Sequence, residues 1–213
     1  MIIIIDQAFK FIKKGDLIKC DLNRVYIDAE TFEEVENLPI ADEEKYKRVR
    51  YSIINAGIGA TAKVVHDAVK IKSWAGSSCY ALAGIATFLG GIDPNLYRLS
   101  IYNEVDGAEK LSWSKDVTSL IFAIHNGRFA GGGMAFTPAC LMNDGLLDVS
   151  YYDNVAQLQH IYKIMNSVLL KGGIHAYEKE WRHLRGSKIV MENLNFEPDS
   201  MKDPLNPKFK KSV

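Results

Sequence analysis

The first half of the chain alternates between short apolar runs and two segments with helical spacing. The runs are rich in Ile, Val and Tyr, which favour extended structure. Strands are expected over residues 17–27 and 49–54, and helices over residues 61–70 and 78–89. Gly90 and Gly91 follow the second helix, and Pro94 prevents an early restart, so this pattern predicts a helix pair with a defined end.

Strand patterns dominate the second half. Residues 97–105 alternate and lead into Asp106-Gly107, a dipeptide that is typical of a hairpin turn. Residues 117–124 are rich in apolar residues and predict one buried strand. Further strands are expected over residues 146–152 and 187–191, and a long helix over residues 154–170.

The two ends of the chain differ from its middle. Asp6 can cap a short helix that ends at Gly15, and the acidic stretch 31–44 is expected to be a solvated loop. Residues 193–213 contain three prolines and no periodicity. We therefore expect one α+β domain over residues 1–192, mostly antiparallel, followed by a polar tail over residues 193–213.

Composition narrows the class of protein. Lys plus Arg equals Asp plus Glu at 26 each, so no basic field indicates a nucleic-acid partner. The apolar opening, residues 1–5, is too short for a signal sequence or a transmembrane span. The three cysteines, Cys20, Cys79 and Cys140, are odd in number and lack metal spacing, which favours reduced thiols and a cytoplasmic location.

Two glycine-rich runs are candidates for function. Residues 55–59 (NAGIG) stand between a strand and a helix, but no Lys-Ser/Thr pair or third glycine follows, so a tight turn with positive φ is favoured over a nucleotide cradle. The second run, Gly131-Gly132-Gly133, follows Asn126-Gly127-Arg128. It fits a bulged hairpin as well as a backbone that closely approaches a ligand or another domain.

Candidate metal and catalytic residues are few. Residues 143–148 (NDGLLD) resemble a fragment of a calcium loop whose remaining positions are absent. An Asx turn that starts a strand explains them simply, and a hard cation held by Asp144 and backbone carbonyls stays open. The histidines form no i,i+4 pair, and Ser77 and Ser78 lie outside any Gly-x-Ser-x-Gly motif, so nothing favours a zinc enzyme or a hydrolase.

Taken together, three segments resemble a known family. They are INAGIG at residues 54–59, NGRFAGGGM at residues 126–134 with Pro138 after it, and NDGLLDV at residues 143–149. In order and spacing they resemble the C-terminal domain of the diacylglycerol kinase family, which includes bacterial lipid kinases, sphingosine kinases and ceramide kinases. The likeness extends from about Asp6 to about Glu192.

The resemblance implies a fold and a reaction. Family members have an N-terminal ATP-binding domain with a Gly-Gly-Asp-Gly-Thr motif and a C-terminal β-sandwich that covers the lipid acceptor. Their active site lies between the two domains. Residues 1–192 would then be the acceptor-side domain of an enzyme that phosphorylates a lipid hydroxyl, such as that of diacylglycerol or a sphingoid base. Eight residues of the matching segments become candidates for the interdomain or substrate cleft: Asn55, Gly57, Gly59, Asn126, Gly127, Arg128, Gly131 and Gly132.

The resemblance also implies a structural Mg²⁺. Its ligands would be the Asp144 carboxylate and the backbone carbonyls of Leu141 and Leu146. Such an ion would fix the strand that Leu146 opens and would take no part in the reaction.

The sequence departs from the family in two respects. It contains neither Gly-Gly-Asp-Gly-Thr nor the Asp-Gly-Glu that supplies the family's general base. We therefore expect no kinase activity from this chain alone, with ATP bound only in a full-length parent enzyme. The expected partners are a lipid acceptor, the missing ATP-binding domain or a full-length relative, and a membrane surface contacted peripherally. A non-catalytic lipid-binding or regulatory module and an unrelated β-rich scaffold are the alternatives.

Overall fold

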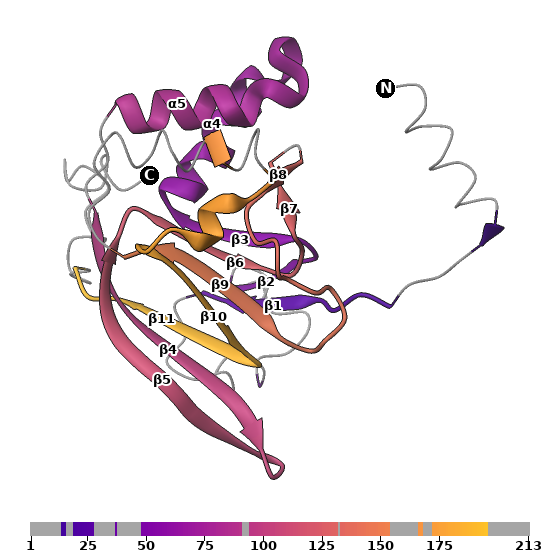
Figure 1. Ribbon diagram of the computed structural model, residues 1–213, viewed down its shortest axis with the longest axis vertical. Helices are drawn as coiled ribbons and strands as arrows, with labels where there is room; N and C mark the ends of the chain where they lie inside the picture. The colour runs from indigo at the N-terminus through magenta and orange to yellow at the C-terminus, as the bar shows by residue number, and fades with distance from the viewer. Residues whose placement is uncertain are drawn as a thin grey trace.

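A computed structural model gives the fold and describes residues 14–15, 19–27, 37, 48–90, 94–131, 133–153, 166–167 and 172–195. Two antiparallel sheets form its centre, with a pair of helices beside one of them (Figure 1). The four-stranded sheet has the order β10-β9-β6-β3 and contains β3 (Asn55–Gly59), β6 (Ile121–His125), β9 (Leu147–Tyr152) and β10 (Trp181–Gly186). The three-stranded sheet has the order β11-β4-β5 and contains β4 (Asn95–Val105), β5 (Ala108–Ser119) and β11 (Lys188–Asn193).

Smaller elements complete the described chain. Strand β1 (Asn23–Tyr26) pairs with β2 (Val49–Ser52), and β7 (Phe129–Ala130) pairs with β8 (Met134–Ala135). The helices are α4 (Ala60–Ala75) and α5 (Cys79–Leu89), joined by the 3₁₀ turn η1 (Gly76–Ser78), and η2 (Ile174–Tyr177) precedes β10. The predicted α+β class, mostly antiparallel, is confirmed, and so is the β-sandwich that the resemblance implied.

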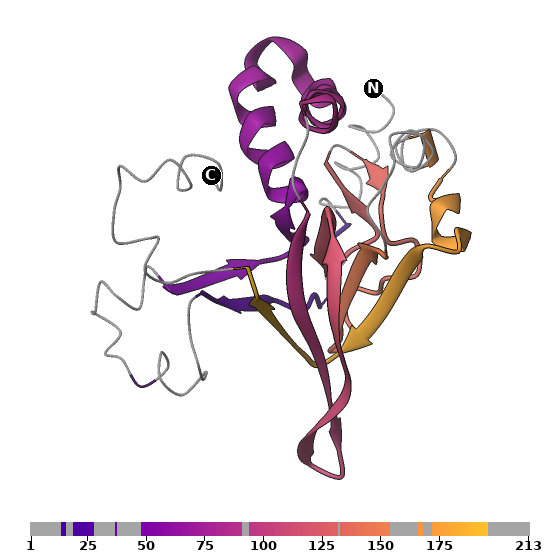
Figure 2. The same ribbon diagram turned by 90° about the vertical axis from the view of Figure 1, so that its left-hand side faces the viewer.

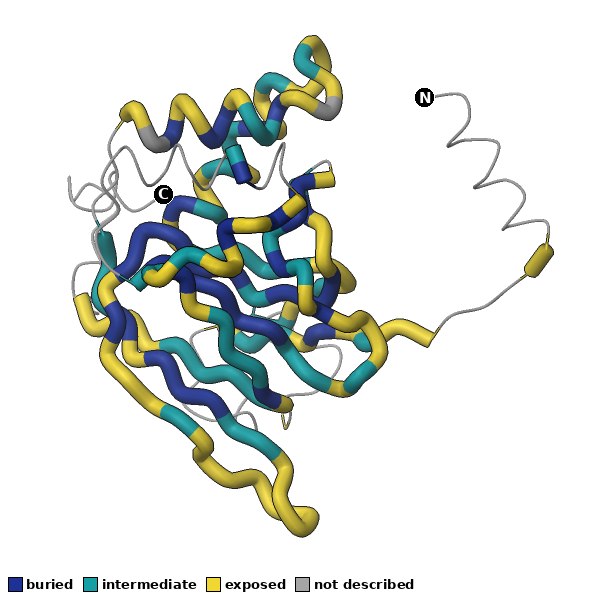
Figure 3. The backbone as a smooth tube through the Cα atoms, in the orientation of Figure 1, coloured by how far each residue is buried: buried dark blue, intermediate teal, exposed yellow. Residues whose placement is uncertain are grey.

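The main core lies between the two sheets. Alternate residues of β6 and β9 face it, among them Phe122, Val149 and Tyr151, and Leu99 of β4 meets them from the other sheet. The rings of Phe122 and Tyr151 stack with centroids 5.3 Å apart. Figure 3 shows this burial concentrated along the sandwich, while the far end of the β4–β5 hairpin is exposed. Period-2 alternation therefore places one face of each sheet in the core.

The helix pair covers the opposite face of the four-stranded sheet. Small residues at the contact, Ala68, Cys79 and Ala83, let α4 and α5 approach closely. Thr61 attaches the start of α4 to the sheet, because its hydroxyl group lies 2.5 Å from the Phe122 carbonyl and accepts the Ile58 amide at 2.8 Å. Figure 2 shows the helix pair and the β4–β5 hairpin projecting in opposite directions from the sheets.

Two predictions about local structure are wrong. Residues 55–59 form strand β3 instead of a tight turn, because the segment pairs with β6 along its full length. Its glycines serve other purposes: a Cβ on Gly57 would lie 2.9 Å from the Thr61 hydroxyl, and Gly59 has φ +65° where the chain turns into α4. The single strand expected over residues 117–124 is divided at Leu120, where the chain passes from the three-stranded to the four-stranded sheet.

Other expectations hold with changed boundaries. The second helix is as predicted, and the first continues five residues further, to Ala75. Asp106 and Gly107 form the expected hairpin turn, both with positive φ. Strand β10 was missed, and β11 reaches Asn193, the first residue of the segment predicted as a tail. The helices expected near residues 6–15 and 154–170, the loop 31–44 and the segment after residue 195 lie almost entirely outside the described residues.

Candidate functional site

One face of the four-stranded sheet carries most of the candidate chemistry. This outer face points away from the sandwich core and towards α4 and α5. The register pairs Asn55 with His125 across β3 and β6, and pairs Asp148 of β9 with His125 and with Arg185 of β10. Ser150 lies two residues from Asp148 on the same face. The outer face therefore brings polar residues from four strands together.

An apolar cavity of about 70 Å³ lies between the outer face and the helices. Asn55, Ile121, Ala123 and His125 line it from the sheet. The remaining walls come from α4, α5 and the β7–β8 hairpin with the residue that follows it: Thr61, Val64, Val65, Tyr80, Gly84, Ala130, Gly131, Met134 and Phe136. Most of these side chains are aliphatic or aromatic. A cavity of this composition suits a hydrocarbon chain and few polar atoms.

His125 is the most deeply buried polar residue of the cavity wall. Its side chain is 1 % exposed, and Nε2 lies 3.0 Å from Ser150 Oγ. The other ring nitrogen, Nδ1, has no hydrogen-bond partner among the described residues. Burial lowers the pKa of the imidazole to about 4, against the opposing influence of the Asp148 carboxylate. His125 is therefore neutral near pH 7.

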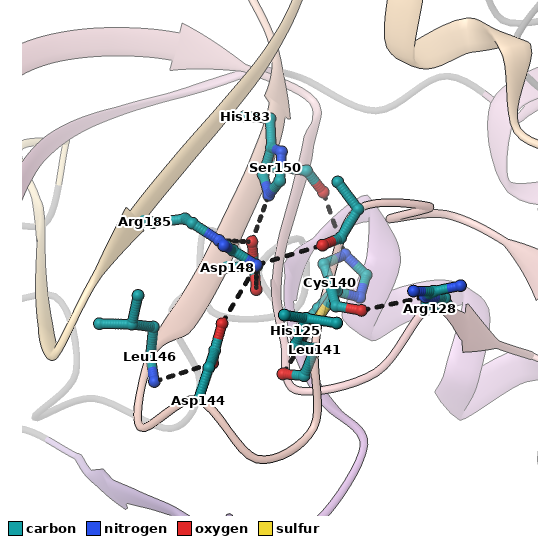
Figure 4. A network of polar contacts seen from close by, with 11 residues as sticks. His125, Arg128, Cys140, Leu141, Asp144, Leu146, Asp148, Ser150, His183 and Arg185 are labelled. Atoms are coloured by element: carbon teal, nitrogen blue, oxygen red, sulfur yellow. Dashed lines mark hydrogen bonds and ion pairs between the residues drawn. The ribbon is translucent and has the colours of Figure 1, made fainter.

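A polar cluster lies beside His125 on the outer face (Figure 4). Asp148 is completely buried and accepts hydrogen bonds from His183 Nε2 at 2.5 Å and Arg185 Nε at 2.8 Å. Burial opposes ionisation, but these bonds outweigh it and lower the pKa of Asp148 to about 2. Arg185 also donates to the Ala139 carbonyl at 3.2 Å and lies 3.4 Å from Asp144. This cluster joins β9 and β10 to the loop before β9.

The loop with the expected metal ligands is ordered by Asp144. Its Oδ1 accepts the Leu146 amide at 3.1 Å, which is the Asx turn expected at the start of the strand. Its Oδ2 is partnered by Arg185 at 3.4 Å, a distance at the long end for an ion pair. In the described residues no group of three or more His, Cys, Asp or Glu could hold a metal ion, so a cation here depends on backbone carbonyls. Hard oxygen atoms of this kind are what Mg²⁺ prefers.

The candidate cleft residues separate into two groups. Asn55 and Gly131 line the cavity. Asn126 is fully buried and its amide donates to the Asp21 and Ile53 carbonyls at 2.6 and 3.1 Å. Arg128 donates to the Cys140 carbonyl at 3.2 Å. The Asn126 and Arg128 side chains thus hold neighbouring loops in place.

The candidate glycines also differ in role. Gly57 and Gly59 shape the passage from β3 into α4, as described above. Gly131 has φ +54° in the β7–β8 hairpin, which agrees with the hairpin alternative, and it lines the cavity as well. A Cβ on Gly127 would meet only ordinary contacts at 3.9 Å. Gly132 lies outside the described residues.

Sequence reasoning missed several site residues. His125 directly precedes the recognised Asn126 motif, and its position in an alternating strand could have placed it opposite Asn55. His183 and Arg185 lie on the outer face of a strand with few apolar residues, so the hydrophobic pattern gave no signal for them. Tyr80 and Val64 belong to helix faces that only the three-dimensional contact with the sheet identifies.

Comparisons with known proteins identify the domain. The family model described as the YegS C-terminal NAD kinase beta sandwich-like domain matches residues 52–203, more than half of the chain. A "Probable lipid kinase YegS-like" of Stenotrophomonas maltophilia (strain K279a) is 30% identical over 155 residues, covering 69% of this chain and 46% of the relative. The protein of the same name in Xanthomonas euvesicatoria pv. vesicatoria (strain 85-10) is 27% identical over 156 residues, with 70% and 46% covered.

A solved structure has a weaker likeness. A diacylglycerol kinase from Bacillus anthracis str. Sterne matches with a TM-score of 0.36 and 19% identity, covering 52% of this chain and 36% of that chain. The chain spans about half the length of the named relatives that it matches. On the extent of the family match, the chain belongs to the family of the YegS C-terminal NAD kinase β-sandwich-like domain.

Proposed function

We propose that this chain is the acceptor-side part of an ATP-dependent lipid kinase. The apolar cavity between the outer face and the α4–α5 pair carries this proposal, because its mostly aliphatic and aromatic walls suit part of the hydrocarbon chain of a lipid. The lipid would be one whose hydroxyl group is phosphorylated, such as diacylglycerol or a sphingoid base. The names of the relatives support the reaction class, since both are called lipid kinases.

The described residues would bind and orient the acceptor. Val64 and Val65 of α4 and Met134 of β8 would contact the chain and exclude water from it. Phosphoryl transfer also needs groups that hold the triphosphate and orient the attacking hydroxyl. The 213 residues contain neither Gly-Gly-Asp-Gly-Thr nor Asp-Gly-Glu. ATP would therefore bind only in a longer parent enzyme, and this chain alone would bind lipid without turnover.

A structural Mg²⁺ is part of the same proposal. Asp144 and the backbone carbonyls of Leu141 and Leu146 would hold it, and the ion would supply a fixed positive charge that rigidifies the loop before β9. A carboxylate offers about four lone-pair sites, and among the described residues Asp144 has two hydrogen-bonding or ionic partners, so acceptor capacity remains there. Arg185 would compete with the ion for Oδ2.

Peripheral membrane contact would bring the lipid to the cavity. The α4–α5 pair exposes apolar side chains, including Trp74 (71% exposed), Ile85 and Leu89. Exposed apolar groups gathered on one helix pair, with a Trp among them, suit a lipid–water interface. No helix in the described segments is long and apolar enough to span a bilayer. The fraction of protein that sediments with phosphatidylcholine–phosphatidylglycerol vesicles should fall in Trp74→Ala. It should stay unchanged in Leu111→Ala, an exposed position of β5.

A matched pair of substitutions tests the cavity. Val64→Phe fills it from α4, whereas Val69→Phe adds the same ring at a 65% exposed position of the same helix. Binding of a fluorescent short-chain diacylglycerol should weaken about tenfold or more in Val64→Phe, since the site would be occluded. Val69→Phe should bind as the wild type does. Equal binding by all three proteins would contradict the cavity as the acceptor site.

A kinase assay separates the two forms of the proposal. The isolated chain, supplied with ATP, Mg²⁺ and diacylglycerol, should form no phosphorylated lipid above a control without protein. Adding a full-length relative then distinguishes a catalytic half from a non-catalytic module. Turnover that rises as more of the isolated chain is added would favour a role in catalysis. Unchanged turnover with retained lipid binding would favour the non-catalytic module.

A further inference from the structure

The buried imidazoles of His125 and His175 differ in how their hydrogen bonds are completed. His175 is completely buried, and both ring nitrogens have partners: the Phe136 carbonyl at 2.8 Å and Ser167 Oγ at 3.2 Å. His125 is equally inaccessible, yet only Nε2 has a partner. Buried polar groups in native proteins nearly always form hydrogen bonds, so an exception needs an explanation. A residue that lines a cavity can obtain its missing bond from whatever enters.

The surroundings of His125 select what could supply that bond. Burial keeps the imidazole neutral near pH 7, so it does not attract an anion as a histidinium would. If the Ser150 hydroxyl donates to Nε2, Nδ1 carries the ring proton and is a donor. If Ser150 accepts from Nε2, Nδ1 is an acceptor. A hydroxyl group can meet either requirement, because it both donates and accepts. A hydrocarbon chain fits the remaining walls.

We propose that His125 is a specificity-determining residue of the cavity, whose Nδ1 hydrogen-bonds a hydroxyl group carried by an aliphatic chain. Asn55, directly opposite on β3, also lines the cavity and stands beside this position. The cavity would thus prefer an aliphatic alcohol over a hydrocarbon of equal length. This inference rests on the proposed function, because it assumes that the cavity receives a lipid chain.

Two probes of equal chain length test the preference. They are 1-hexanol, which carries a hydroxyl group, and 1-fluorohexane, which carries a fluorine atom in its place. Displacement of 1-fluorohexane by 1-hexanol can be followed by ¹⁹F NMR. The proteins are the wild-type chain and the double variant His125→Leu/Ser150→Ala, which removes the imidazole without leaving the serine unpaired. The control His66→Leu replaces a histidine that is exposed on α4.

The ratio of the two affinities is the decisive quantity. One neutral hydrogen bond is worth about three- to tenfold in affinity, so the preference for 1-hexanol should fall by that factor in the double variant. His66→Leu should keep the wild-type ratio. In the wild-type chain, the ¹⁵N resonance of His125 Nδ1 should shift on adding 1-hexanol and stay in place with 1-fluorohexane. This second readout decides the matter if the double variant does not fold.

Failure of the inference differs from failure of the proposed function. Both probes can bind while the ratio of their affinities is the same in the wild type and the double variant, or while the Nδ1 resonance does not shift on adding 1-hexanol. Either result would mean that His125 does not select the ligand, although the cavity still accepts an aliphatic chain. If neither probe binds, the cavity does not receive aliphatic ligands, which overturns this inference and the proposed function together.

Discussion

Two buried polar residues lie next to each other on the outer face: a carboxylate held by two basic side chains, and an imidazole with one nitrogen that has no hydrogen-bond partner among the described residues. Asp148 is held by His183 and Arg185 within the polar cluster. His125 lies beside the cavity with Nδ1 unpaired among the described residues. Both residues are nearly inaccessible, so burial alone does not distinguish them.

The difference indicates two kinds of purpose. A fully bonded charge fixes the positions of the elements that surround it, here β9, β10 and the loop that leads into β9. A polar group left incomplete beside an apolar cavity costs stability, which a binding site can recover when its ligand arrives. The polar cluster is therefore suited to structure and the cavity to recognition.

The largest effect should follow from breaking the polar cluster. Asp148→Asn weakens the charge-assisted hydrogen bonds from Arg185 and His183. Because these side chains are 35% and 27% exposed and can be hydrated, the loss is that of two such bonds, about 3 kcal/mol. Urea denaturation at pH 7 would measure this loss of unfolding free energy. Asp116→Asn is the control, since the Asp116–Arg98 pair is 47% exposed on both sides and should contribute under about 1 kcal/mol. Equal losses in the two variants would contradict the structural role of the cluster.

Acid should affect the stability contributions of His125 and Asp148 in separate pH ranges. The folded pKa of His125 is about 4, below its ordinary 6.5, so the unfolded chain binds more protons and stability falls as the pH drops from 6.5 to 4. Its contribution is at most about 3 kcal/mol. The folded pKa of Asp148 is about 2, below its ordinary 3.8, so its contribution persists above pH 4 and is lost between pH 4 and 2.

Two variants resolve these ranges. In His125→Gln the unfolding free energy should depend less on pH between 6.5 and 4. Some dependence should remain, because burial also lowers the pKa of His175. Asp148→Asn should weaken the pH dependence of the unfolding free energy below pH 4 only in part, because Lys63 and Lys70 also lower the pKa of Asp67. Unfolding free energies from urea titrations at half-unit pH steps supply the measurement. A His125→Gln profile that coincides with that of the wild type would show that this imidazole does not resist protonation.

The strand and turn patterns were sufficient for the mostly antiparallel α+β class, because alternating strands and glycine turns are local signals, whereas the sandwich was implied by the family resemblance. The patterns could not divide residues 117–124 at Leu120, since strand-forming residues continue through that corner. Strand β10 gave no hydrophobic signal. Its outer-face residues His183 and Arg185 are polar because their partner Asp148 is buried in a different strand.

The candidate site was predictable to a smaller extent. Asn126 and Arg128 stand out in the sequence, but their side chains bond to backbone carbonyls of neighbouring loops, and they hold the frame of the site. His125 stands next to them without any motif of its own. Its importance depends on Ser150, 25 residues away, and on helices that no local pattern places over the strand.

Magnesium should give the smallest effect, and it tests whether the polar cluster extends to a bound ion. If Asp144 and the carbonyls of Leu141 and Leu146 hold Mg²⁺, an ion concentration of ten times its dissociation constant stabilises the fold by about 1.4 kcal/mol. Thermal melting with Mg²⁺ and with EDTA should therefore differ in the wild-type chain and coincide in Asp144→Ala. Asp106→Ala, at the exposed tip of the β4–β5 hairpin, should keep the wild-type difference. Wild-type melting curves that coincide in Mg²⁺ and EDTA would mean that Arg185 alone neutralises Asp144, so that the cluster is complete without a metal ion.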